Sequence, residues 1–215
     1  QNFEKCITYG KELFQQYPSQ SIIKNIIGAS YAALGDYQNS INEYEGALKI
    51  NPDNAQVYNN LGITYKKLGD YPKAIETFKK SIYIKNDFAE AFNNLALSLK
   101  EENKLNDAIF NLKKAISIKP DYAEAFFNLG NTLTALGDFN EAIKMFKKAT
   151  KINSNYFEAF NNMGSTYNLL KDYINAHESI SKSILPWSIM IHHDLGRTLN
   201  SWRPLDDDED DHHRV

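Results

Sequence analysis

The sequence repeats itself every 34 residues, and this period constrains the fold more than any other feature of the chain. Five units align without a gap: residues 21–54, 55–88, 89–122, 123–156 and 157–186, the last of them incomplete. Units of this length are typical of arrays in which each supersecondary element is stabilised by its neighbours. The period therefore predicts an elongated solenoid. Positions within each unit are numbered from 1 to 34.

Each unit carries the pattern of a helical hairpin. The first half of the unit 55–88 has apolar or small residues one helical turn apart, at Tyr58, Leu61, Gly62 and Tyr65. Gly69 and Asp70 then supply a helix stop and a turn, and Pro72 suits a first helical turn because its missing N–H has no partner there. The spacing predicts a second helix from Pro72 to about Lys85.

The two ends of the chain depart from the period. Residues 1–20 fit the second helix of a truncated unit, and because the chain starts at Gln1 we interpret it as a fragment or a processed form. Residues 187–202 are predicted to form a final capping helix. Residues 203–215 hold six acidic side chains against two arginines, a composition that predicts a disordered tail.

The unit resembles the tetratricopeptide repeat (TPR) over about residues 1–188. The resemblance rests on aromatic residues at position 4, Leu-Gly at 7 and 8, Tyr at 11, Gly-Asp at 15 and 16, Ala at 20, Phe at 24, Ala at 27 and Pro at 32. The sequence departs from this pattern at Lys24, Asn86, Ala96 and Ser154. The resemblance implies an all-α fold, an α-α superhelix built as a right-handed solenoid of TPR hairpins, and a role in protein–protein interaction.

Charge and composition argue against several classes of partner. The net charge is −3, and the tail 203–215 accounts for −4, so the remainder is close to +1 and lacks the basic surface that nucleic acid requires. No run of 18 apolar residues is present, so no membrane partner is expected. The single cysteine, Cys6, excludes an internal disulfide framework. We interpret it as a sign of a reducing, cytoplasmic compartment.

The sequence shows no motif of a catalytic or cofactor site. It contains no glycine-rich phosphate loop, no nucleophile elbow and no paired cysteine and histidine. His192, His193 and Asp194, like the cluster at 210–213, lack further ligands for a metal ion and are interpreted as incidental. We therefore expect no enzymatic activity, no metal and no cofactor.

The candidate binding residues are a ladder of asparagines. Positions 2, 6, 9 and 13 lie opposite the packing stripe of the first helix and are expected to form the inner, concave surface. Position 6 is asparagine in four successive units, at Asn60, Asn94, Asn128 and Asn162. A carboxamide offers both a donor and an acceptor, so it can pair with a peptide backbone whatever the side chains. Helices about 10 Å apart and about 3.3 Å per extended residue give one rung for every three peptide residues.

This ladder resembles the inner surface of the TPR arm of O-GlcNAc transferases. In that family, asparagines at the matching positions hold the substrate polypeptide, and the resemblance extends to the four position-6 asparagines alone. The alternative is that the repeat consensus simply tolerates asparagine on an exposed face.

Neighbouring positions suggest which peptides the groove prefers. Position 2 holds Gln56, Glu90, Glu124 and Glu158; Asn131 stands at position 9 and Phe127 at position 5 of the unit 123–156. An acidic edge favours neutral or basic peptides. Co-chaperone TPR domains place lysine and arginine in the groove to hold an acidic C-terminus, so a ligand of that kind is not expected here.

The sequence supports three functional hypotheses. The first is a scaffold that binds an extended polypeptide in its concave groove. The second is the substrate-recognition arm of a larger, glycosyltransferase-like enzyme whose catalytic domain is absent from this chain. The third is a structural protein that assembles into homo-oligomers through its terminal helices.

Overall fold

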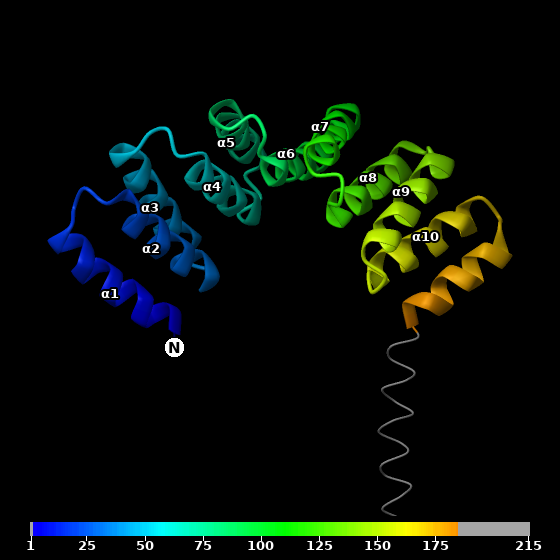
Figure 1. The fold of residues 1–215 in the computed structure, drawn as a ribbon, viewed down its shortest axis with the longest axis horizontal. Coiled ribbons are helices and arrows are strands. Elements are labelled where there is room, and N and C mark those ends of the chain that lie inside the picture. Colours follow the sequence, from blue (N-terminus) through cyan, green and yellow to red (C-terminus); the bar gives the residue numbers. More distant parts are fainter. Residues whose placement is uncertain (1, 185–215) are drawn as a thin grey trace, which may run out of the picture.

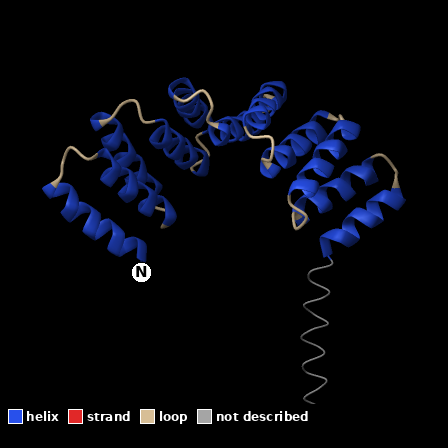
Figure 2. Cartoon of the chain, viewed as in Figure 1, coloured by secondary structure: helices blue, strands red, loops and turns tan. Residues whose placement is uncertain are grey.

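A computed structural model describes residues 2–184 of the chain, and in that range it contains only helices and turns (Figure 2). The helices are α1 (Asn2–Gln16), α2 (Ser21–Ala33), α3 (Tyr37–Ile50), α4 (Ala55–Lys67), α5 (Tyr71–Ile84), α6 (Ala89–Glu101), α7 (Leu105–Ile118), α8 (Ala123–Leu136), α9 (Phe139–Ile152), α10 (Phe157–Leu169) and a further helical segment at 173–184. The predicted capping helix at 187–202, the acidic tail at 203–215 and the histidines and aspartates within them lie outside the described residues.

The helices form a curved array of hairpins. Each of α2, α4, α6 and α8 packs against the helix that follows it, and each hairpin packs against the next. The first helices also contact one another along the array, whereas α3, α5, α7 and α9 do not approach each other. The first helices therefore line the inside of the arc that Figure 1 shows, with the second helices outside. The predicted all-α superhelix of helical hairpins is confirmed.

A glycine and an aspartate end one helix and start the next. Gly35, Gly69 and Gly137 have φ between 78° and 88°, a left-handed conformation that glycine adopts without strain. The aspartate that follows caps the second helix by accepting a hydrogen bond from the backbone N–H three residues on, as Asp70 does from Lys73 at 3.2 Å. The same cap forms at Asp36, Asp138 and Asp172. At α7 this pair is replaced by Asn103 and Lys104, and no side chain caps the helix.

Close packing inside every described hairpin except α6–α7, which has Ala96 at this position, depends on a glycine opposite a large side chain. A Cβ added to Gly130 would lie 2.6 Å from the ring of Phe146, which is fully buried, and Gly62 has the same relation to Phe78 at 2.7 Å. Alanines at positions 20 and 27 of the second helices are also fully buried. These contacts continue from one hairpin to the next, so a single core cluster runs from Ala74 to Ala176.

Adding a methyl group at the α8 to α9 contact tests this packing. Gly130→Ala is expected to lower the free energy of unfolding by about 1–3 kcal/mol, because the buried ring of Phe146 has no room to move. Gly46→Ala in α3 is the matched control, since its Cβ would meet only the flexible end of Lys24. That control should be neutral or stabilising by up to about 1 kcal/mol. Guanidinium denaturation followed by circular dichroism measures both, and equal midpoints would contradict the packing described.

The uncapped α7 provides a second test. Lys104→Asp should raise the stability by about 0.5–2 kcal/mol, because residue 104 has nearly the backbone angles of the capping aspartates and would accept from the N–H of residue 107. The helix α9, where Asp138 precedes Glu141, already combines such a cap with an acidic side chain at this place. Asp138→Ala should lower the free energy of unfolding by a similar amount. An unchanged thermal midpoint for Lys104→Asp would show that the cap is not limiting there.

Candidate concave peptide-binding groove

The candidate site is the inner face of the arc, which we call the concave groove. It is formed by positions 2, 6, 9 and 13 of α2, α4, α6, α8 and α10. The second helices lie outside the first helices (Figure 1), and Phe146 of α9 contributes a side chain to the groove lining. All of the predicted site residues come from these inner helices.

Side-chain hydrogen bonds join the ladder asparagines to asparagines of the preceding repeats. Three of the four donate a side-chain N–H to an asparagine at position 5 of the preceding inner helix: Asn60 to Asn25 at 3.1 Å, Asn94 to Asn59 at 3.1 Å and Asn128 to Asn93 at 2.9 Å. The sequence analysis did not include these hydrogen bonds between repeats. One N–H of each ladder amide serves to hold adjacent inner helices together.

The series changes at α8, where position 5 is Phe127. Its ring packs 6.0 Å from that of Phe146 and 4.9 Å from that of Tyr156, so the side chain is half-buried between repeats. Because Phe127 has no amide to offer, Asn162 donates to Asn131 at position 9 instead, at 2.8 Å. The predicted residues Asn131 and Asn162 are thereby brought together.

Burial divides the amides into two sets. The acceptors Asn59 and Asn93 are 4% and 1% exposed, which places them beyond the reach of a ligand. Asn60, Asn94 and Asn162 are only half-buried, and Asn128 is 7% exposed. Within the described residues, the side-chain oxygens of Asn94 and Asn162 accept no hydrogen bond, whereas that of Asn60 accepts one from Gln56 at 3.1 Å. The ladder therefore retains hydrogen-bonding capacity on its groove side.

A second ladder, of hydroxyl groups, was not recognised from the sequence. Position 10 is serine or threonine in every inner helix, and each is at most 4% exposed. Each hydroxyl donates to the backbone carbonyl of position 6 of its own helix, at Ser30, Thr64, Ser98, Thr132 and Thr166. These small side chains form their hydrogen bonds within their own helix, and they fit between closely spaced helices. The recurrence of a small hydroxyl residue at position 10 was the signal that could have revealed them.

Charges line the two edges of the groove unequally. At the edge formed by the helix N-termini, Glu90 lies 3.7 Å from Lys119 and Glu124 accepts a hydrogen bond from Asn93 at 3.2 Å. Glu158 is exposed and has no ion pair within the described residues. Burial, together with the nearby carboxylates of Glu124 and Glu158, raises the pKa of Tyr156 to about 12. The acidic edge is thus partly neutralised by its own neighbours.

The opposite edge carries lysines at position 12, with Glu101 beside them at position 13 of α6, a feature that the sequence reasoning did not include. Lys66 and Lys100 occupy position 12 of α4 and α6, near the C-termini of these helices, where a positive charge is favoured. Burial and the neighbouring Lys67 lower the pKa of Lys66. Neither Lys66 nor Lys100 forms an ion pair within residues 2–184.

A hollow of about 440 Å³ opens in the groove where the ladder changes partner. It lies between α6, α8, α9 and α10, and its apolar lining consists of Ala135, Phe146 and Leu169. The polar residues that line it are Lys100, Asn131, Thr134, Asn162, Ser165 and Thr166. The hollow can receive a polar side chain, with hydrogen-bond partners on both sides.

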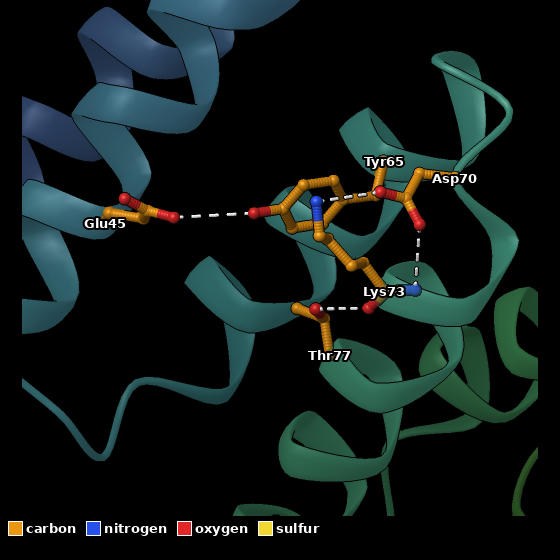
Figure 3. A network of polar contacts seen from close by, with 5 residues as sticks. All are labelled: Glu45, Tyr65, Asp70, Lys73 and Thr77. Carbon is orange, nitrogen blue, oxygen red and sulfur yellow. Dashed lines mark hydrogen bonds and ion pairs between the residues drawn. The ribbon is translucent and has the colours of Figure 1, made fainter.

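Two of the hollows on the outer side of the array have matching linings, and a third, of about 600 Å³, is lined by Pro52, Asp53, Tyr58, Glu76, Lys79, Lys80, Tyr83 and Ile84. Of the matching two, one, of about 360 Å³, is between α3, α4 and α5, and the other, of about 290 Å³, lies three repeats later with lining residues at the same repeat positions. Figure 3 shows polar contacts at the first: Glu45 accepts from Tyr65, and Lys73 pairs with Asp70. Glu76 pairs with Lys80 in the same hollow and Glu178 with Lys182 in the other. Because most of these charges already have partners, the concave groove is the stronger candidate.

The described residues contain no metal site or membrane span. Within residues 2–184, no three histidine, cysteine or carboxylate side chains gather closely enough to hold a metal ion. No described helix combines the length and the apolar composition needed to cross a bilayer.

Solved structures with the same architecture include several TPR proteins. MamA superposes with a TM-score of 0.71 at 26% identity, covering 77% of this chain and 97% of its own. YrrB, described as a TPR protein with an unusual peptide-binding site, superposes with a TM-score of 0.66 at 21% identity. The match covers 90% of this chain and 98% of YrrB. A chain of the APC/C hetero-tetramer Cut9–Hcn1 superposes with a TM-score of 0.73 at 18% identity. The match covers 86% of this chain and 37% of the other. At 21% and 18% identity, the last two show the fold alone.

Sequence comparison identifies the repeat itself. No curated protein matches the sequence. A TPR repeat model matches residues 28–69 and 98–137, and a tetratricopeptide repeat model matches 55–88 and 123–156. Together these matches cover 28–88 and 98–156, which is more than half of the 215 residues. The chain belongs to the tetratricopeptide repeat family.

Proposed function

We propose that this chain is a protein-interaction scaffold whose concave groove binds an extended polypeptide segment. Membership of the TPR family and the likeness to TPR structures support the general role of an interaction scaffold, and proteins of this family are generally not catalysts. YrrB, which has the same fold, is described as having a peptide-binding site.

The observation that carries the proposal is the groove-side capacity of the asparagine ladder. After the bonds between repeats are made, Asn94 and Asn162 each retain an N–H and an oxygen without a partner in the described residues. Such groups favour a polar ligand that supplies alternating acceptors and donors, which a peptide backbone does. Inner helices about 10 Å apart would meet the backbone once in about every three residues.

The charges of the groove favour a neutral or basic segment along the N-terminal edge of the helices. Glu158 and Gln56 are exposed there, and Glu124 remains exposed although it accepts a bond from Asn93. Lys66 and Lys100 face the ligand from the other edge, so an occasional acidic residue on that side is compatible with binding. A uniformly acidic segment is not expected, because it would place carboxylates against three glutamates.

A second candidate function is the substrate-recognition arm of a larger enzyme. The four ladder asparagines at the positions matching those of the O-GlcNAc transferase arm favour it. The sequence that flanks this segment in the full gene distinguishes the two: an adjoining glycosyltransferase-like domain would support the arm, and its absence would support an independent scaffold.

A third candidate is self-assembly through the terminal helices. On α1, Phe3, Tyr9 and Leu13 are 48%, 66% and 44% exposed. Light scattering across a concentration series tests this, because a mass that stays at the 24.6 kDa of one chain excludes it.

A pair of asparagine variants tests the groove. Asn94→Ala and Asn59→Ala each remove the same hydrogen bond, of 3.1 Å, but only Asn94 has atoms that reach the groove. Peptides are first selected with the wild-type chain from a displayed library of random peptides. Their affinity should fall roughly 2–10-fold on Asn94→Ala, which is the loss of about 0.5–1.5 kcal/mol of hydrogen bonding. Fluorescence anisotropy with labelled peptides measures it.

The control separates binding from stability. Asn59→Ala should destabilise the fold about as much as Asn94→Ala and leave the peptide affinity within about twofold of wild type, because Asn59 is 4% exposed. Equal losses of affinity for the two variants would mean that the ladder acts through the fold and not by contacting the ligand. A wild-type chain that selects no peptides would overturn the proposal.

A further inference from the structure

The inner helix α2 differs from the other four at the positions that face the groove. Position 2 is Gln or Glu and position 6 is Asn in α4, α6, α8 and α10, whereas α2 has Ile22 and Ile26 there. These two side chains are 53% and 47% exposed. At the end of the groove, the polar ladder is therefore replaced by an apolar surface.

Within residues 2–184, this surface is not part of the core. The opposite face of α2 carries Ile23 and Ile27, which are 7% and 1% exposed and pack with Ile7 of α1. Thus α2 is apolar on its groove side as well as on its packed side. A helix that is apolar all round is normally covered on every side, and within residues 2–184 nothing covers Ile22 and Ile26.

The surface carries no charge. The remaining groove positions of α2 are Ala29 and Ala33. The one charged side chain of α2, Lys24, is bound to Glu43 of α3 at 2.7 Å. A charged segment of a ligand would find no partner there and would lose its hydration, whereas aliphatic side chains would gain by burial.

The apolar surface continues the ladder directly. Asn25, next to Ile26, accepts a hydrogen bond from Asn60. The helix α2 therefore lies directly beside α4 on the inner face, one repeat before the first ladder asparagine. We propose that Ile22 and Ile26 form a specificity site for aliphatic side chains of the bound polypeptide, about three residues along the backbone from the part held at Asn60. This inference rests on the proposed function and adds a sequence requirement to it.

The test uses a variant that gives α2 the groove residues of the other repeats. Ile22→Glu combined with Ile26→Asn reproduces what α6, α8 and α10 carry, so the fold is expected to tolerate it. Peptides selected by the wild-type chain from a displayed library of random peptides should share aliphatic residues at one place. The double variant should bind these peptides roughly 10–100-fold more weakly. Replacing the shared aliphatic residues of the peptide by serine should cause a similar loss on wild type and little on the double variant.

Control variants separate this inference from the groove proposal. Ile152→Asn changes an isoleucine that is 41% exposed at the end of α9, outside the groove, and should leave the affinity unchanged. If Asn94→Ala weakens binding but the double variant does not, the ladder proposal stands and the specificity site is wrong. Selected peptides without shared aliphatic residues would also overturn it. So would a loss of oligomers in light scattering on the double variant without any change in peptide affinity, because a second copy would then be the occupant.

Discussion

The close approach of two helices at a glycine is the contact on which the rest of the structure depends. Where Gly62 and Gly130 face Phe78 and Phe146, the absence of a Cβ lets the ring lie against the backbone of the partner helix. The same ring is then buried by the next hairpin, so each repeat completes its core only through its neighbour. The spacing of the inner helices, and with it the spacing of the groove residues, follows from this packing.

The asparagine ladder helps to fix the distance between adjacent inner helices, in addition to its proposed role in binding. Each amide at position 6 holds the preceding repeat, and this structural use is enough to explain why the residue recurs. What supports a binding role is the remaining capacity on the groove side and the replacement of the pattern at both ends. In α2, isoleucines stand at the groove positions, and in α10 Asn162 donates to Asn131 because position 5 of α8 is Phe127. Such local differences are where one repeat protein can differ from another in the ligand it accepts.

Much of the fold could be predicted from the sequence, because the period and its glycines, aspartates and aromatics act locally. The helix stop at Gly69, the cap at Asp70 and the close approach at Gly62 were all readable from residue type and spacing. The amide bonds between repeats were not, since they join residues 35 apart and depend on how far one hairpin is rotated against the next. For the same reason the edge that carries Lys66 and Lys100 became visible only in three dimensions.

The amide bonds also determine how the arc can deform. They tie the inner helices in series, from Asn25 to Asn162, whereas the backbones of the outer helices α3, α5, α7 and α9 do not come close to one another. Bending that spreads the outer helices breaks none of these ties, but lengthening the inner face strains all of them. Each outer helix nevertheless packs against the next inner helix, so a change of curvature would have to rearrange the core between hairpins, while the amide bonds oppose any separation of the inner helices.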